Sequence, residues 1–370
     1  MAGLDADVIV IGAGIVGAAC AREMARAGLR VLVLDAGPAV YRGATHAGMG
    51  HLVLMDDNPA ELALCRDSLQ QWRDWSHAMP EDCAYTGVGT LWIAANEAEM
   101  AEAERKQQGL REQGIASVLM TATELARAEP SLRAGLAGAL KVPGDALVYA
   151  PNAARWMLQH PGIQFETAHV CALNAQRVVL SDGSQRRAPA VVLAAGLQAT
   201  ALCPELPIRP KKGHLAITDR YPGSVHHQLV ELGYISSAHH AQEASVAFNA
   251  QPRPTGQLQL GSSRQFDTTD PNVEWPMLQR MLQRSLSYLP GLADLNVIRC
   301  WTGFRAATPD SLPIIGLHPT RPGLWLAVGH EGLGVTTSPG TARLLAAQIT
   351  GSTPPFDPLP YRAQRFEDMA

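Results

Sequence analysis

The sequence predicts an α/β protein of two domains, an α+β arrangement in which a mainly antiparallel sheet is inserted into a parallel one. In residues 7–35 an apolar strand, a glycine-rich turn, a helix and a second apolar strand follow one another. From Lys212 to Arg299 the pattern changes to short apolar or alternating runs between Pro- and Gly-rich loops, as in antiparallel sheets. With 370 residues, the chain also exceeds the size at which a single core keeps growing.

The composition describes an ordinary globular chain and argues against several protein classes. Hydrophobic residues make up 46% of the chain and charged residues 17%. The net charge of −4, without a basic block, gives no reason to expect nucleic-acid binding. No apolar stretch has the length of a membrane span, and the N-terminus lacks the basic region of a signal peptide. Six scattered cysteines without a C-x-x-C pair favour the cytoplasm and argue against a metal centre held by this chain.

Residues 7–35 predict a Rossmann-like unit that binds an adenine dinucleotide. Gly12 permits the tight turn after the first strand, Gly14 lets the backbone approach a pyrophosphate, and Gly17 lets the helix pack closely. The second strand ends at Asp35, which is expected to accept hydrogen bonds from ribose hydroxyls. The alternative is a βαβ unit that packs without a ligand, and it leaves the missing side chain at Gly14 unexplained.

The rest of the chain is predicted to alternate between helices, strands and loops. A loop is expected over 36–50, and 301–316 is expected to be a close-packed segment of small residues. Helices are expected over 59–77, 97–113, 150–158, 275–289 and 336–349. Strands are expected over 91–94, 178–180, 191–196, 215–217, 245–248, 258–260 and 324–328.

Several motifs that are weak signals singly occur in a specific order. They are the N-terminal glycine unit, ATHAGM at 44–49, VVLAAG at 191–196, RPKKGH at 209–214, GSSR at 261–264, WTGFR at 301–305 followed by TPD and PIIG, and GHEGLGVT at 329–336. In this order they resemble the FAD-dependent amino-acid oxidases and dehydrogenases of the D-amino-acid oxidase and glycine oxidase (DAO) family. Within that family the motif sequences are most similar to those of flavin subunits of D-hydroxyproline-type dehydrogenases.

The resemblance implies a noncovalent FAD in a discontinuous FAD-binding domain. We expect this domain to comprise residues 1–82, 146–208 and 301–370, with residues 83–145 and 209–300 forming the substrate-binding domain. By the family pattern, 44–45 meet the pyrophosphate, 48–49 line the isoalloxazine and the backbone at 170 contacts adenine. The residues expected at FAD are Gly12, Gly14, Ile15, Val16, Gly17, Asp35, Ala36, Ala44, Thr45, Gly48, Met49, Val170, Ala195, Gly196, Gly332, Leu333, Gly334, Val335 and Thr336.

The resemblance also implies an amino or imino acid substrate that loses a hydride from Cα to flavin N5. Arg305 lies in the motif where the family places the arginine for the substrate carboxylate, and its planar fork can bind that group bidentately. The alternative is a structural ion pair between Arg305 and Asp310. The glycine loop at 332–336 is expected to direct N–H groups and a helix dipole at the flavin N1–C2=O2 edge. The alternative is a glycine-rich loop that only begins a helix and does not contact the flavin.

Other polar residues are candidates for the substrate pocket. His46 lies near the position where some relatives attach flavin covalently, but the local sequence differs and a covalent bond is the minor alternative. His51 either faces the substrate or is a hydrogen-bonded packing residue, and Tyr234 either reaches the carboxylate or belongs to the core. Arg264 is a further pocket candidate, and His330 is expected to brace the glycine loop. No dedicated base is needed if the substrate binds with a neutral amine.

These observations predict an FAD-dependent amino-acid dehydrogenase or oxidase, with D-hydroxyproline or a related small amino acid as the substrate. Electrons would pass to oxygen or to partner subunits that carry flavin or an iron–sulfur cluster. One alternative is a stand-alone glycine, sarcosine or D-amino-acid oxidase. A nicotinamide dehydrogenase needs neither the strand at 191–196 nor the C-terminal glycine loop, and a noncatalytic flavoprotein has no need of Arg305 in its motif.

Overall fold

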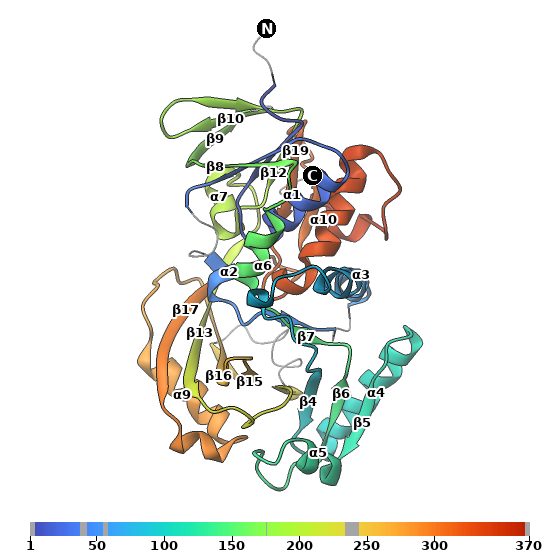
Figure 1. Cartoon of the computed structure of the whole chain (residues 1–370), viewed down its shortest axis with the longest axis vertical. Helices are drawn as coiled ribbons and strands as arrows, with labels where there is room; N and C mark the ends of the chain where they lie inside the picture. The colour runs from blue at the N-terminus through green and yellow to red at the C-terminus, as the bar shows by residue number, and fades with distance from the viewer. Residues whose placement is uncertain (1–3, 38–42, 55–57, 175, 234–243, 367–370) are drawn as a thin grey trace.

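Two large sheets, one above the other in Figure 1, make up most of the molecule. Helices α2 (Gly43–Ala47), α3 (Pro59–Ser76) and α6 (Ala150–Met157) lie at the level between them. The computed structural model describes residues 4–37, 43–54, 58–174, 176–233 and 244–366.

The upper sheet has six strands in the order β18-β19-β12-β1-β2-β8. Only β18 runs antiparallel to its neighbour, whereas β1 pairs in parallel with β2 and β12. Every residue of β1 and β12 is buried, as in a sheet covered on both faces. The strands are β1 (Val8–Ile11), β2 (Val31–Asp35), β8 (Ile163–Thr167), β12 (Ala190–Leu193), β18 (Ile314–Leu317) and β19 (Leu324–Val328).

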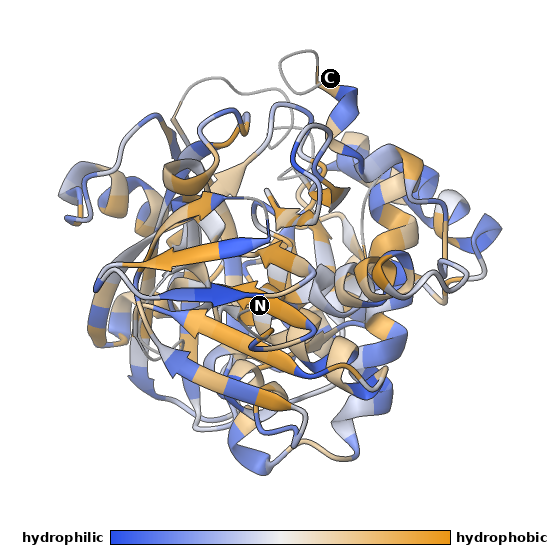
Figure 2. Cartoon of the chain, turned by 90° about the horizontal axis from the view of Figure 1, so that it is seen from above, coloured by the Kyte–Doolittle hydropathy of each residue, from blue (hydrophilic) through white to orange (hydrophobic). Residues whose placement is uncertain are grey.

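Helices cover one face of the upper sheet and a small sheet covers the other. Helix α10 (Gly334–Thr350) packs against α1 (Ile15–Arg26) and α3. Gly340 permits the contact with α3, because a Cβ there would lie 2.5 Å from Ser68 Oγ. On the other face the upper sheet packs against β10 of a three-stranded sheet, and near the centre of Figure 2 orange, hydrophobic strands lie beside a mostly blue one. The small sheet consists of β9 (Val170–Asn174), β10 (Arg177–Leu180) and β11 (Gln185–Arg187).

The lower sheet has eight strands in the order β17-β13-β16-β15-β14-β4-β6-β5. Its pairs are antiparallel except for β4 and β14. Helix α9 (Trp275–Leu286) packs on β15 and β16, and α4 (Glu97–Glu112) and α5 (Ala122–Ala128) pack on β6. The strands are β4 (Thr90–Ala94), β5 (Val118–Thr121), β6 (Gly138–Val142), β13 (Arg209–Arg220), β14 (Gln228–Glu231), β15 (Ser245–Pro252), β16 (Gln257–Phe266) and β17 (Val297–Ala307).

These two sheets confirm the predicted α/β, two-part architecture with a mainly antiparallel second sheet. The division of the chain at particular residues stays a prediction, and the boundary placed at residue 300 falls within β17.

Several predicted elements have a different extent or type. The segment 36–50, predicted as a loop, contains the short helix α2. The strand predicted over 215–217 is part of the longer β13, and the segment at 301–316 begins inside β17. Each strand contains a glycine, which interrupts the alternating pattern by which strands are predicted. In β17 this glycine is required, because a Cβ at Gly303 would lie 2.4 Å from Ala47 Cβ. The strand predicted over 191–196 ends at residue 193, and the helix predicted over 275–289 ends at residue 286.

Gly17 provides a test of how closely α1 must approach the first strand. A Cβ at Gly17 would lie 1.9 Å from the carbonyl oxygen of Gly12, so Gly17→Ala forces the helix away from the sheet. We expect the free energy of unfolding, measured by urea denaturation, to fall by about 1–3 kcal/mol, as for other overpacked sites. Gly109→Ala in α4 is the matched control, since nothing lies within 4 Å of its added Cβ and alanine favours helix there. Equal effects of the two substitutions would contradict the steric explanation.

Candidate active site

A cavity of about 440 Å³ lies where the two sheets meet, and residues of both sheets line it. Most of the residues predicted to bind the cofactor are among them. They are Gly12, Gly14, Ile15, Val16, Asp35, Ala36, Ala44, Thr45, Gly48, Met49, Val170, Ala195, Gly196, Gly332, Gly334 and Val335. Gly17, Leu333 and Thr336 do not line the cavity. Thr336 is buried, and its hydroxyl donates to the carbonyl of His51 at 2.9 Å.

The glycine turn after β1 has the geometry that its sequence predicts. Gly12 has a φ of +102°, and a Cβ there would lie 2.5 Å from the carbonyl oxygen of Ala194. At the start of α1, the N–H of Ile15 donates to Thr45 Oγ1 at 2.9 Å. Thr45 therefore holds α2 against the N-terminus of α1, and the same N-terminus borders the cavity.

Asp35 has a local structural role that the sequence did not reveal. One of its carboxylate oxygens accepts from the N–H of Ala13 at 2.7 Å, and the other accepts from the N–H of Gly37 at 3.0 Å. The carboxylate thus joins the end of β2 to the glycine turn. Its contact with ribose stays a prediction.

The glycine loop before α10 presents backbone to the cavity. Glu331 adopts a left-handed conformation with a φ of +45°, and α10 begins at Gly334 without a side-chain hydrogen bond at its N-terminus. Unsatisfied N–H groups and the positive end of the helix dipole are therefore available at this edge. This geometry suits an anionic or electron-rich group.

Arg305 extends from β17 over its neighbouring strands. Its Nη1 donates to the carbonyl of Ser263 on β16 at 3.2 Å. Gly213 on β13 leaves room for the guanidinium, because a Cβ there would lie 2.8 Å from Nη1. The alternative partner Asp310 instead forms an ion pair with Arg365 at 2.6 Å. The cavity is thus lined by a guanidinium that is not the ion-pair partner of Asp310.

The structure adds a charged pair that the sequence analysis missed. The Nζ of Lys211 lies 2.5 Å from Glu331 Oε1, and both side chains are buried or nearly so. Burial alone would raise the pKa of Glu331, but Lys211, Arg305 and Arg264 lower it overall. Glu331 lines the cavity as a carboxylate, next to the guanidinium of Arg305.

His51 lines the cavity and is hydrogen-bonded through both ring nitrogens, and its contact with the substrate stays a prediction. Its Nδ1 lies 2.9 Å from Gln228 Oε1, and its Nε2 lies 3.0 Å from Asn249 Nδ2. Burial, aided by the positive charges of Arg253 and Arg305, lowers the pKa of His51 to about 4. His51 is therefore neutral near pH 7.

The other candidates have mixed outcomes. Tyr234 lies outside the described residues. His46 belongs to α2 and does not line the cavity, and neither does the buried Arg264. His330 lines the cavity, and its Nε2 lies 3.0 Å from the hydroxyl of Thr341 in α10. Such a contact suits the bracing role predicted for it.

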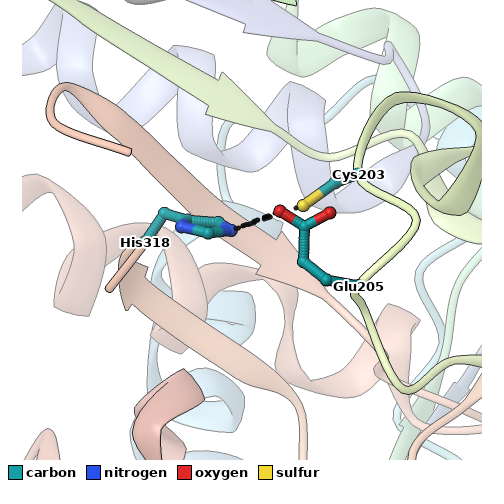
Figure 3. Close-up of side chains that lie close together, drawn as sticks. All are labelled: Cys203, Glu205 and His318. Carbon is teal, nitrogen blue, oxygen red and sulfur yellow. Dashed lines mark hydrogen bonds and ion pairs between the residues drawn. The ribbon is translucent and has the colours of Figure 1, made fainter. Parts of the chain in front are cut away.

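A separate polar cluster of Cys203, Glu205 and His318 has side chains close enough to share an ion, but none of the three lines the cavity (Figure 3). His318 Nε2 lies 3.2 Å from Glu205 Oε1, while His318 Nδ1 accepts from the N–H of Thr320. A neutral ring with that tautomer carries its proton on Nε2, the atom that would have to bind the ion. Glu205 also pairs with Arg321 at 2.8 Å, so hydrogen bonds and an ion pair account for the cluster.

Comparison with known proteins identifies the family. A model described as FAD dependent oxidoreductase (DAO) matches residues 7–348. The chain belongs to this family. FAD is accordingly its cofactor, which members typically hold without a covalent bond. The structure fits this group, because the residues expected at the adenine end, such as Val170, and Arg305 at the other end line one cavity.

Individual relatives match over almost their whole length. The chain is 28% identical to a glycine oxidase of Pseudomonas aeruginosa, covering 96% of this chain and 97% of that one. It is 26% identical to one of the subunits of an opine oxidase from Rhizobium meliloti, covering 98% of each chain. The crystal structure of glycine oxidase from Geobacillus kaustophilus matches with a TM-score of 0.87 at 25% identity, covering 98% of this chain and 99% of that one. Within the described residues, no helix has the length and apolar character needed to cross a membrane.

His330 provides a test of how the burial of a neutral histidine makes the free energy of unfolding depend on pH. Burial lowers its pKa to about 3, so as pH falls from 6.5 the unfolded state takes up a proton before the folded state does. The stability contributed by neutral His330 is present above pH 6.5 and is lost below it. We therefore expect the difference in free energy of unfolding between wild type and His330→Gln to shrink between pH 6.5 and 4, by up to about 1.4 kcal/mol per pH unit.

Urea denaturation of both proteins across this pH range measures that difference. Other groups titrate in both proteins and cancel, including His51 and Asp145, whose pKa burial raises to about 7. The exposed His77→Gln is the matched control for the change of residue type. A difference that is constant with pH would contradict the burial effect.

Proposed function

We propose that this chain oxidises a small amino or imino acid whose carboxylate binds Arg305. The observation that carries the proposal is the guanidinium of Arg305, which lines the cavity between the glycine loop and the lower sheet. A Cβ at Gly332 would lie 3.6 Å from Arg305 Nε, so the arginine lies directly beside that loop. The names of the two relatives, a glycine oxidase and part of an opine oxidase, agree with a substrate of this class.

The residues around the cavity have separate tasks in this proposal. Bound FAD supplies the acceptor, at flavin N5, for the hydride that leaves the substrate Cα. Arg305 orients the substrate, because two parallel N–H···O bonds fix the plane of a carboxylate. The N-terminus of α10, at Gly334 and Val335, would hold the negative charge that reduction adds. Gly213 and Gly303 leave the space that the guanidinium and α2 occupy.

The histidines at the cavity do not act as proton acceptors in this proposal. Their low pKa values make them poor bases near pH 7, and hydrogen bonds already engage both nitrogens of His51 and Nε2 of His330. The substrate therefore enters with a neutral amine. Its hydride can then leave without prior removal of a proton by the protein.

The proposed substrate is D-hydroxyproline or a related small amino acid, and the proposed compartment is the cytoplasm, where six free thiols stay reduced. A panel of D- and L-amino acids, hydroxyproline isomers, proline, glycine and sarcosine tests the substrate by anaerobic bleaching of the flavin. Bleaching by hydroxyproline isomers first supports the proposal. Bleaching by glycine or sarcosine first supports the alternative of a stand-alone oxidase.

Arg305→Leu tests the carboxylate contact. Each charge-assisted hydrogen bond contributes about 1.5–3 kcal/mol, so the loss of two lowers kcat/KM by about 10²–10⁴-fold. Arg305→Lys keeps the charge without the planar fork and should retain an intermediate rate. The readout is anaerobic flavin reduction by the best substrate of the panel. Arg280→Leu, at an exposed position of α9, is the control with no expected effect. An Arg305→Leu variant that keeps its flavin and is reduced at the wild-type rate would refute the proposal.

The electron acceptor is proposed to be a partner protein that carries flavin or an iron–sulfur cluster. The opine oxidase relative is, by its name, one of several subunits of a larger enzyme. We expect the isolated, substrate-reduced chain to be reoxidised faster by an artificial electron acceptor than by air. Reoxidation by air at the faster rate favours the stand-alone oxidase instead.

A further inference from the structure

Asn249 holds an unpaired hydrogen-bond acceptor at the cavity. Its side chain lines the cavity and is 5% exposed. The amide nitrogen faces His51, but Oδ1 has no hydrogen-bond partner in the part of the chain that the structure describes. Leaving a buried acceptor unpaired costs about 1–3 kcal/mol. At a ligand cavity, such an acceptor indicates that the ligand supplies the missing donor.

A row of hydrogen bonds that starts at a backbone carbonyl sets the orientation of Asn249. The carbonyl oxygen of Ala146 can only accept, so the amide NH₂ of Gln228 must face it, at 2.8 Å. Gln228 Oε1 then faces His51 Nδ1 at 2.9 Å, and this ring nitrogen must carry the proton. Since His51 is neutral, its Nε2 accepts from Asn249 Nδ2 at 3.0 Å. Oδ1 of Asn249 is thereby turned away from His51.

If every hydrogen bond in the row were reversed, the contact between Gln228 and the carbonyl of Ala146 would become unfavourable. Turning Asn249 would require His51 to donate from Nε2 and Gln228 to present its NH₂ to Nδ1. Gln228 Oε1 would then lie 2.8 Å from the carbonyl oxygen of Ala146, which places two acceptors in contact. Gln251 Nε2 also donates to Gln228 Oε1, at 3.4 Å, in the observed orientation. The backbone carbonyl of Ala146, which cannot turn, thus fixes the polarity of the row.

Asn249 and Arg305 approach the same part of the lower sheet. Asn249 on β15 pairs with Gly261 on β16. Two positions along β16, the carbonyl of Ser263 accepts from Arg305 Nη1. The charge of Arg305 also lowers the pKa of His51, the hydrogen-bond partner of Asn249. Both residues line one cavity, and Arg305 reaches the strand that pairs with the strand of Asn249.

We propose that Asn249 Oδ1 accepts a hydrogen bond from the reacting nitrogen of the substrate while Arg305 holds its carboxylate. This inference rests on the proposed function. An acceptor on the N–H leaves the nitrogen lone pair free to form the C=N bond as the hydride leaves Cα. The opposite orientation of the amide would bind that lone pair and oppose the reaction. The site thus selects primary or secondary amines, which carry an N–H, over tertiary amines.

Two planar carboxylates test the proposal on the holoenzyme without turnover. Pyrrole-2-carboxylate offers a ring N–H beside its carboxylate, and furan-2-carboxylate has an oxygen in that place. Dissociation constants come from the change in flavin absorption on titration. A net hydrogen bond of about 0.5–1.5 kcal/mol corresponds to roughly two- to tenfold tighter binding of the pyrrole acid. Equal binding of the two acids to wild type would overturn the proposal without any variant.

Asn249→Leu removes the acceptor at similar volume. We expect the preference for the pyrrole acid to disappear in this variant, because the pyrrole N–H loses its acceptor and the furan oxygen no longer faces one. Gln228→Leu removes the anchor of the row and should reduce the same preference, because His51 and Asn249 can then turn. A variant at Asn249 that keeps its flavin and retains the wild-type preference would overturn the proposal.

Arg305→Leu separates this inference from the proposed function. If Arg305 holds the carboxylate, that variant weakens both acids by the same factor and leaves the preference between them. Unchanged binding of both acids would refute the carboxylate contact, and with it the proposed function. Weakened binding of both, combined with a preference that does not depend on Asn249, would refute only the assignment of the nitrogen contact.

Discussion

Strand β17 fixes the distance between the two sheets, and the geometry of the cavity depends on it. Near its C-terminal end, the carbonyl of Ala306 accepts from the N–H of Glu331 at 3.0 Å. Nearer its N-terminal end, Trp301 Nε1 donates to the carbonyl of Ala47 in α2 at 3.0 Å. Arg305 lies between these two anchors. The guanidinium is consequently held relative to the glycine loop and to α2, although it belongs to the opposite sheet.

The ion pair of Lys211 and Glu331 reinforces this connection. Lys211 is paired with Arg305 on the adjacent strand, so one carboxylate from the glycine loop is placed among charges of the lower sheet. Buried charges are tolerated only when they are paired, and removal of either partner leaves the other uncompensated. The pair therefore links cavity electrostatics to the docking of the two sheets. A change in the position of the loop would alter both.

Features that depend on residues close together in the sequence could be predicted, and features that depend on distant residues could not. The turn at Gly12 and the close approach at Gly17 were predictable because the positive φ of Gly12 and the contact of Gly17 with the Gly12 carbonyl involve only nearby residues. The motif around Arg305 was also recognisable, but the strand that carries it was concealed by Gly303, whose missing side chain interrupts the alternating pattern. A short helix at 43–47 has too few residues to show periodicity.

The polar contacts of the cavity were beyond the sequence because they join distant segments. His51 meets Gln228 across 177 positions, and Lys211 meets Glu331 across 120. No spacing rule connects such residues, and the low pKa of His51 follows from its burial and from the nearby charges of Arg253 and Arg305. Asn249 gave no signal, since an asparagine within a strand resembles any other polar residue until its unpaired oxygen is seen.

The charges around Arg305 explain why neutral amines suit this site. Lys211, Arg264 and Arg305 are all close enough to the Glu331 carboxylate to lower its pKa. This field favours a substrate carboxylate and disfavours an ammonium group close to it. Under the proposed function the amine loses its proton to solvent on entry, and the proposed contact with Asn249 Oδ1 positions the remaining N–H. Under the proposed function, the protein thus selects a protonation state instead of providing a base, which is why neutral histidines can line the cavity without a catalytic task.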